Sequence, residues 1–284
     1  MVSLNNDTVG TLVSRRFFDS TCDIGGIVGT GTNFCYAESL SNIHTLTSAD
    51  KRRYNKREMI INIESGNFNK LPRNVYDIIL DKDSVNRGRH LEEKMVSGLY
   101  LGELTRLVIV DLITKGLLFS RRLSQKELAL VNEKGSFKTS FLTKITGDTS
   151  GTLTRVDTLL RGWGIKKTHI SLEDKRIIKN ICQDVVRRAA RITAAVVFSI
   201  VTHIDREIAS PHTIAIDGSV FEKTPQFEKE MVRALKEVST EFFGDDRSQK
   251  ISFRLTTDGS GVGAAIIAAT AKSSTRLPGK VRRF

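Results

Sequence analysis

The chain has 284 residues, of which 39% are hydrophobic and 27% are charged. This composition is typical of a globular protein and excludes fibrous and disordered classes, and the length suffices for one large core or two small ones. The longest apolar run, at 194–201, is too short to span a membrane. The first ten residues lack the basic and apolar regions of a secretory signal. We therefore expect a cytoplasmic protein with no membrane partner.

Charge and cysteine content test for two ligand classes, nucleic acid and metal. Lysine and arginine number 44 against 32 acidic residues, a net charge of +12, which keeps nucleic-acid binding open as an alternative. The basic clusters at 51–57, 187–191 and 280–283 lie far apart, and no aromatic residues interleave with them as a base-stacking surface needs. Nucleic acid is therefore disfavoured as a partner. The three cysteines lack metal-ligand spacing, so we expect buried, reduced thiols and no metal site.

The first ~90 residues are predicted to form short strands and turns. The apolar stretch at 23–28 predicts a strand, the GTGTN sequence at 29–33 a turn, and 34–37 a second strand. After the basic loop at 51–57, residues 59–64 alternate in polarity and predict another strand.

The middle of the chain is predicted to be helical. Apolar residues between 91 and 118 recur close to the helical period, whereas 133–155 is rich in Ser, Thr and Gly and predicts a surface excursion. Residues 171–174, Ser-Leu-Glu-Asp, are typical of an N-terminal cap. They open a periodic run to about residue 196, which predicts a long core-facing helix with solvated arginines.

The last third alternates between strand and helix. A strand at 212–216 runs into a turn at 217–219, and a helix is predicted to start at Thr224-Pro225. A strand at 250–255, a turn at 256–261 and an Ala-rich helix at 262–271 repeat the pattern. Two such units indicate an α/β fold with its ligand at the carboxyl ends of the strands. A single glycine turn, however, is more often a simple chain reversal.

Six ordered motifs together resemble those of the hexokinase family, from about residue 4 to about residue 272. They are NDTVGT at 6–11, IVGTGTN at 27–33, INIE at 61–64, EKMVSGLYLGEL at 93–104, IAIDGSVF at 214–221 and DGSGVGAA at 258–265. The resemblance implies the actin-like, RNase H-like sugar-kinase ATPase fold, a mixed sheet flanked by helices, represented by the large lobe only. It also implies a large-lobe domain at 1–275 and a basic tail at 276–284.

The resemblance implies ATP-dependent phosphorylation of a hexose such as glucose at its 6-hydroxyl, the first step of glycolysis. Such a reaction needs a base for the hydroxyl, ligands for the sugar and neutralisation of the triphosphate. The base is implied to be Asp7, and the sugar ligands Asn6, Asn33, Glu64 and Glu93. The nucleotide ligands are implied to be Gly29, Thr30, Gly31, Thr32, Asp217, Gly218, Ser219, Gly259, Ser260 and Gly261. Mg²⁺ travels with ATP, without a dedicated metal site.

Each of these residues also has a purely structural interpretation. Asp7 suits a turn or a helix cap, and Asn33 suits the end of a hairpin turn. Glu64 suits an edge strand, and Glu93 suits the start of a helix because of the helix dipole. The order of the six motifs favours the functional interpretation.

The sequence departs from the family in three ways. We find no DLGGTNFR-like first phosphate loop and no Ser-Phe-Pro segment, which belong to the other lobe. Ser65 stands where the family has an aromatic residue, and 86–89 reads Asn-Arg-Gly-Arg instead of Asn-Pro-Gly-Gln. Because closing two lobes completes a kinase site, we expect little turnover from this chain alone. A non-catalytic sugar- or nucleotide-binding module, a fragment of a longer gene, and a second chain that supplies the missing lobe all remain open.

Overall fold

A five-stranded mixed sheet organises the protein. The computed structural model describes residues 6–54, 57–121 and 123–274, and the basic tail predicted at 276–284 lies outside them. The strand order is β3-β2-β1-β4-β5; β1–β2 and β2–β3 are antiparallel, and β1–β4 and β4–β5 are parallel. The strands are β1 (Cys22–Val28), β2 (Thr32–Ser39), β3 (Glu58–Asn62), β4 (His212–Asp217) and β5 (Ile251–Leu255). The structure therefore confirms the mixed α/β class.

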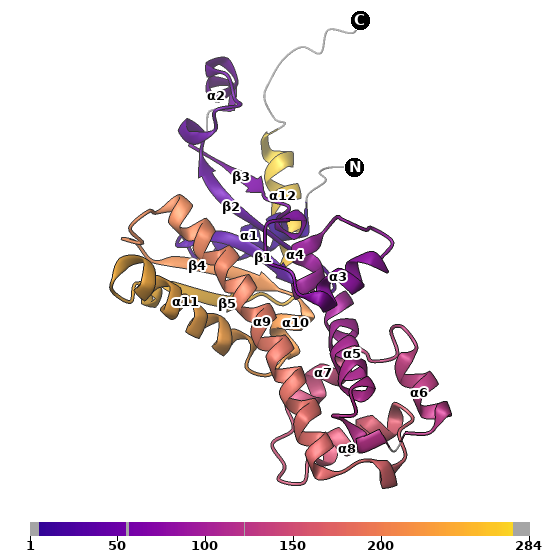
Figure 1. Cartoon of the computed structure of the whole chain (residues 1–284). Helices are drawn as coiled ribbons and strands as arrows, with labels where there is room; N and C mark the ends of the chain where they lie inside the picture. Colours follow the sequence, from indigo (N-terminus) through magenta and orange to yellow (C-terminus); the bar gives the residue numbers. More distant parts are fainter. Residues whose placement is uncertain (1–5, 55–56, 122, 275–284) are drawn as a thin grey trace, which may run out of the picture.

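Helices cover both faces of the sheet (Figure 1). One face carries α9 (Leu172–Ile204) and α11 (Phe227–Phe243), and the other carries α1 (Asp7–Arg16) and α12 (Gly259–Ser274). Alternate residues of a strand face opposite sides. Accordingly, Cys35 packs with Leu12 of α1 in a small cluster, whereas its neighbour Phe34 belongs to the main core on the α9 face.

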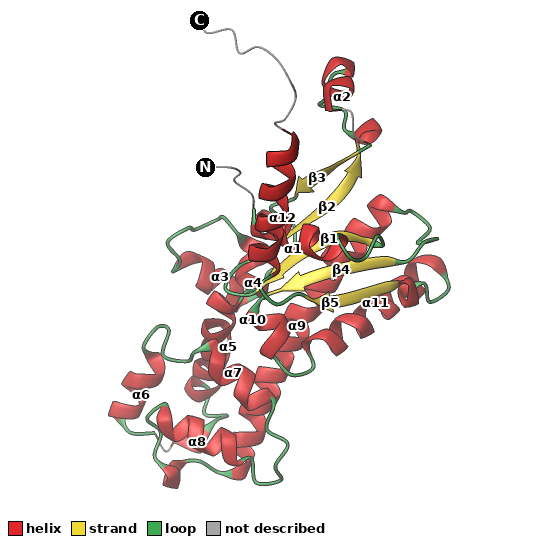
Figure 2. Cartoon of the chain, turned by 180° about the vertical axis from the view of Figure 1, so that it is seen from behind, coloured by secondary structure: helices red, strands yellow, loops and turns green. Residues whose placement is uncertain are grey.

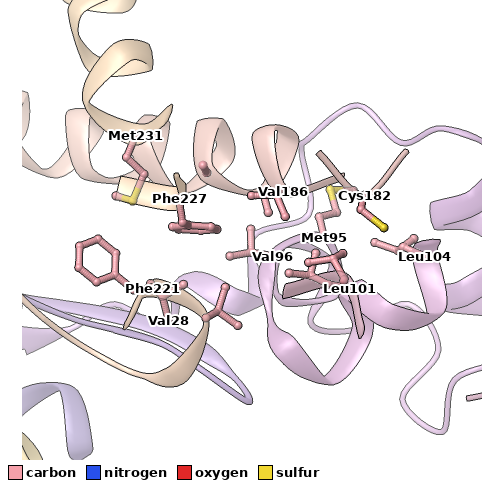
Figure 3. Packing of buried hydrophobic residues seen from close by; sticks show 14 of the residues in the cluster. Val28, Met95, Val96, Leu101, Leu104, Cys182, Val186, Phe221, Phe227 and Met231 are labelled. Carbon is pink, nitrogen blue, oxygen red and sulfur yellow. The ribbon is translucent and has the colours of Figure 1, made fainter. Parts of the chain in front are cut away.

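Helix α9 is the long core-facing helix that the sequence predicts. Ser171 and Asp174 form a reciprocal capping box at its start, and its 33 residues run through the centre of the main core. Figure 3 shows Val186 and Cys182 of α9 among side chains from the sheet and from neighbouring helices. The arginines are only partly solvated, because Arg188 forms a two-point ion pair with the buried Asp77. All three cysteines are free and buried, as predicted.

A group of helices extends the fold beyond one end of the sheet (Figure 2). These helices are α5 (Gly98–Thr114), α6 (Gln125–Asn132), α7 (Thr139–Thr146) and α8 (Thr154–Gly162). The predicted surface excursion at 133–155 is wrong, since α7 packs against α5 and α9 and buries Leu142 and Ile145. The Ser and Thr residues of α7 suggested a surface loop, although its apolar residues recur with helical spacing.

The prediction of only strands and turns before residue 90 is also wrong. Helix α1 was missed because Thr8, Val9, Thr11 and Val13 are β-branched and Gly10 is a poor helix former. Two further helices precede residue 90, α2 (Ser48–Tyr54) and α3 (Val75–Lys82).

Two predicted helix boundaries move. The helical stretch from residue 91 is two helices, α4 (Leu91–Val96) and α5, because Ser97 between them is extended. The helix expected from Thr224 is α11, which starts at Phe227 after the short α10 (Ser219–Lys223).

No helix in the described part of the chain has the length and apolar character to cross a membrane.

Candidate functional site

Asp7 lies at the start of α1, directly over the sheet. Asn6 caps this helix, its Oδ1 accepting hydrogen bonds from the amide and hydroxyl of Thr8 at 3.0 and 2.6 Å. Helix α1 approaches β1 closely, because a Cβ on Gly25 would lie 2.5 Å from the carbonyl oxygen of Thr8. Burial raises the pKa of the Cys35 thiol to about 12, and the negative charge of Asp7 adds to this shift. Asp7 is therefore an exposed carboxylate beside the Cys35 position of β2.

Asn33 lies on the same face of β2 as Cys35, two residues earlier. Its Nδ2 donates to Oδ1 of Asn62 at 2.7 Å, and its Oδ1 accepts from the Ser65 amide at 3.2 Å. The Nδ2 of Asn62 in turn donates to Oε1 of Glu64 at 2.6 Å. Antiparallel pairing of Cys35 with Asn62 sets this alignment. Asn33 and Glu64 are thus joined through one intervening amide.

The structural interpretation of Glu64 as an edge-strand residue is wrong. Strand β3 ends at Asn62, and Glu64 adopts a left-handed conformation with φ of 55° before the single turn η2 (Ser65–Asn67). A non-glycine residue in this region is uncommon and recurs where a side chain has a special task. The bend leaves the carboxylate of Glu64 exposed beside Asn62.

Glu93, on α4, reaches the turn that precedes Asn33. Its Oε2 accepts a hydrogen bond from the Thr32 amide at 3.2 Å. Two glycines make room for it, since a Cβ on Gly31 would lie 2.8 Å from Oε2 and one on Gly66 would lie 3.1 Å from the Glu93 Cβ. The Glu93 side chain of α4 and the backbone of η2 at Gly66, far apart in sequence, therefore meet at the 29–33 turn that leads into β2.

The three predicted nucleotide turns also come together. A Cβ on Gly29 would lie 3.3 Å from the Cα of Gly218, whose φ of 121° suits glycine. Asp217 Oδ2 accepts from the Gly259 amide at 3.2 Å. Residues 259–261 are not a loop before a helix, as predicted, but the first turn of α12. Amides at a helix start are suited to anions.

A cavity of about 540 Å³ opens beside these turns. It is lined by Thr30 and Ser219 from the predicted set and by Gly98 of α5, whose amide donates to the Gly29 carbonyl at 2.7 Å. Its remaining wall includes residues that the sequence analysis missed, among them Lys138, Thr139, Ser140, Thr143, Lys144 and Lys223. Two lysines and three hydroxyl residues within seven positions at the start of α7 are the signal that could have revealed this wall.

The 86–89 segment, which departs from the family pattern, is held in place by the buried side chain of Lys94. The Nζ of Lys94 donates to the carbonyls of Asn86 and Arg89 at 2.9 and 2.8 Å and to Asp81 Oδ1 at 2.7 Å. The segment therefore keeps a fixed conformation without the proline of the family pattern. Within the described residues, no three His, Cys, Asp or Glu side chains converge as a metal site would require.

Comparison with known proteins gives one consistent result. Residues 23–270 match the family described as Hexokinase. Rat hexokinase-1 is 34% identical over 277 residues, covering 95% of this chain and 28% of that protein. Human hexokinase-2 is 34% identical over 279 residues, again covering 95% of this chain and 28% of that protein.

Solved structures agree with the sequence comparisons. A hexokinase from Schistosoma mansoni complexed with glucose is similar with a TM-score of 0.78 and 34% identity, covering 93% of this chain and 56% of that one. Another hexokinase crystal structure gives a TM-score of 0.74 at 27% identity, covering 94% of this chain and 55% of that one. This chain spans 28% of the length of the curated relatives named above. By the extent of the family match and the shared fold, the chain belongs to the hexokinase family.

Proposed function

We propose that these residues bind a hexose, with glucose as the leading candidate, and ATP, for phosphoryl transfer to the 6-hydroxyl in the first step of glycolysis. The observation that carries the proposal is the convergence of Asn33, Glu64 and Glu93 on one side of the 29–33 turn, while Thr30 of that turn lines the lysine-rich cavity. A transfer reaction needs this arrangement, with acceptor and donor meeting at a shared boundary.

On the acceptor side, the sugar hydroxyls are bound by the side chains of Asn6, Asn33, Glu64 and Glu93. Amides and carboxylates that are already held by other groups lose little freedom on binding, and Asn33 and Glu64 share Asn62 as such a support. Asp7 accepts the proton of the 6-hydroxyl as its oxygen bonds to the γ-phosphorus. The β–γ bridging P–O bond breaks, and ADP and a hexose 6-phosphate leave.

On the donor side, the phosphates lie against residues 29–32 and 217–219 and the first turn of α12. The positive end of the α12 helix dipole lies at 259–261, although the Gly259 amide itself donates to Asp217, and Lys138, Lys144 and Lys223 supply positive charge at the adjoining cavity. Mg²⁺ arrives bound to ATP and neutralises phosphate charge. We assign residues 1–275 to the large lobe of the family.

Binding and turnover must be measured separately, because a solved hexokinase has nearly half of its chain outside the matched part. Isothermal titration with glucose and with Mg-ATP measures binding, and a coupled assay measures turnover. We expect Asp7→Asn to lower any turnover about 100-fold or more while glucose still binds. Asp184→Asn, at an exposed site on α9, is the matched control.

The assay also separates the rival functions. Glucose and ATP binding without Asp7-dependent turnover indicates the non-catalytic binding module, or a need for a second chain. Failure to bind glucose excludes the sugar-kinase proposal. Tight, salt-sensitive RNA or DNA binding that survives Lys138→Ala and Gly259→Ala supports the nucleic-acid alternative.

A further inference from the structure

A buried carboxyl group that the proposed reaction does not use lies next in sequence to the proposed sugar ligand Glu93. Glu92, also on α4, is 0% exposed, and neither of its side-chain oxygens has a hydrogen-bond partner among the described residues. An ionised carboxylate in such surroundings loses its hydration without compensation, a cost that is avoided when the group binds a proton. Accordingly, burial raises the pKa of Glu92 from 4.5 to about 8, and the negative charge of Glu93 adds to the shift.

Neighbouring basic groups do not take the place of this proton. Helix α4 packs against α3, α5, α9, β2 and η2, and η2 carries no charged residue. Four basic side chains of α4 and of these elements are paired with other acids. The pairs are Lys94 with Asp81 of α3, Arg106 with Glu103 of α5, Arg188 of α9 with Asp77 of α3, and His203 of α9 with Glu38 of β2. His90, just before α4, has its Nδ1 3.7 Å from Oε1 of Glu93.

The first turn of α4 joins two parts of the candidate sugar site. The Glu92 amide donates to the Phe68 carbonyl at 3.2 Å, directly after η2. The next residue, Glu93, accepts through Oε2 from an amide of the turn before β2 at 3.2 Å. At the start of η2, the Ser65 amide donates to Oδ1 of Asn33 at 3.2 Å. A shift of α4 therefore displaces Glu93 directly and reaches Asn33 through η2.

Ionisation of Glu92 consequently acts on the sugar ligands. Once the carboxyl has lost its proton, the new charge gains hydration only if the start of α4 opens, because the group is fully buried and has no described partner. We propose that Glu92 is a proton-linked positioning residue, whose neutral form holds α4 and Glu93 in the hexose-binding arrangement and whose ionised form releases them. The proton is thus an effector of hexose affinity, and by linkage a bound hexose raises the proton affinity of Glu92. The effect on the hexose rests on the proposed function, whereas the opening of α4 does not.

Titration of the full chain with glucose from pH 6.5 to pH 9 tests this regulation. The glucose dissociation constant of the wild type should rise about tenfold between pH 7 and pH 9, because the ratio of ionised to neutral Glu92 grows tenfold for each pH unit. Binding at pH 8–9 should also take up protons, which titration calorimetry detects in buffers of different ionisation enthalpy. Glu92→Gln and Glu92→Leu, which cannot ionise, should remove both effects. Glu241→Gln, exposed on α11, is the matched control and should keep the wild-type profile.

Hydrogen exchange of the peptide that contains α4, measured without glucose, separates this inference from the proposed function. After correction for the intrinsic pH dependence of exchange, protection of α4 should fall above pH 8 in the wild type but not in Glu92→Gln. If glucose binds at no pH while protection follows this pattern, the opening of α4 stands and the sugar-kinase proposal fails. A wild-type glucose affinity that is independent of pH, or a pH dependence that Glu92→Gln retains, overturns the inference. So does equal protection of α4 in the wild type and Glu92→Gln at every pH.

Discussion

Gly10 of α1 and Gly263 of α12 cross in direct backbone contact: a Cβ on Gly263 would lie 1.9 Å from the Gly10 carbonyl oxygen. On its other side α1 rests on Gly25 of β1. Helix α1, which begins with Asp7, is therefore held between the sheet and α12, which begins with Gly259. The contact fixes the proposed base and one proposed phosphate turn relative to each other.

Gly263→Ala should consequently separate α1 from α12. We expect a loss of about 1–3 kcal/mol in the free energy of unfolding, as for other overpacked contacts, together with weaker Mg-ATP binding. Urea unfolding and isothermal titration measure the two effects. Gly162→Ala in α8, where nothing lies within 4 Å of an added Cβ, is the control and should be neutral or slightly stabilising. Equal behaviour of the two variants would contradict the role of the crossing.

His212 should make stability depend on pH. It is buried at the start of β4, with Nδ1 2.6 Å from Asp23 Oδ2 and Nε2 3.4 Å from Asp205 Oδ2. Burial alone lowers the pKa of His212, but the two carboxylates outweigh it and the pKa is raised above 6.5. A raised histidine pKa contributes stability that is fully present below about 6.5 and is lost as the pH rises through the folded value.

The measurement is urea unfolding of the wild type and His212→Asn from pH 6 to pH 9. The variant should be less stable by ~2 kcal/mol at pH 6, since it leaves the partly buried carboxylates of Asp23 and Asp205 without their charged partner, and the difference should shrink as the pH rises. His44→Asn, at an exposed position, should show no such trend. A difference that grows with pH would refute the interpretation.

Glu92 should add to the loss of stability as the pH rises, at lower pH and for a different reason. Its side chain is fully buried beside Glu93, neither carboxylate oxygen has a described hydrogen-bond partner, and burial raises its pKa from 4.5 to about 8. The unfolded chain ionises this acid above pH 4.5, so folding is penalised increasingly up to about pH 8. Glu92→Gln should therefore gain stability relative to the wild type across this range, by up to ~1.4 kcal/mol per pH unit. Parallel pH profiles would contradict this, and Glu241→Gln, exposed on α11, is the control.

Lys94 should be essential for the 86–89 segment. Its side chain is 3% exposed and that of its partner Asp81 is 10% exposed. Lys94→Met leaves this carboxylate only the Gly88 amide, at 2.9 Å, and Arg73, at 3.5 Å. Breaking a buried ion pair costs about 3–5 kcal/mol, and we expect a loss at the lower end of that range, about 3 kcal/mol. Lys115→Met removes the same kind of pair with Asp111 at an exposed site, where water screens the charges, and should leave stability almost unchanged. Urea unfolding compares them, and similar losses would mean that Lys94 does not anchor the segment.

The sequence predicts those parts of the fold whose local pattern and final environment agree. The α9 helix follows from a capping box and a regular apolar period, and the strands on either side of the 29–33 turn from their apolar stretches. Helix α1 could not be predicted, because its β-branched residues favour a strand while tertiary contacts with Gly25 and Gly263 stabilise a helix. Helix α7 could not be predicted for a similar reason, because its many polar residues outnumber the apolar residues of its buried face.

The candidate site, like the fold, could be predicted only in part from the sequence. Asp7, Asn33, Glu64 and Glu93 came from the motifs. The link between Asn33 and Glu64, however, depends on the register of β2 with β3, and the approach of Glu93 to the 29–33 turn depends on the space left by Gly31 and Gly66. Neither is visible in a single sequence, since a shift of one residue would reverse the faces of β3. The lysines that line the 540 Å³ cavity, Lys138, Lys144 and Lys223, were missed because they come from segments with no motif of their own.

The last prediction concerns these three lysines. Lys138, Lys144 and Lys223 are exposed side chains at the mouth of the 540 Å³ cavity beside Thr30, and a triphosphate there would neutralise them. Lys138→Ala or Lys223→Ala should weaken ATP binding about tenfold, ~1.4 kcal/mol, and leave the glucose dissociation constant unchanged. Because charge contacts are screened by salt, ATP affinity should also fall less steeply with ionic strength in the variants. Lys229→Ala, exposed on α11 outside the cavity, controls for net charge. If it weakens ATP binding as much as the cavity variants do, the attraction is a general effect of the +12 charge and the cavity is not the nucleotide site.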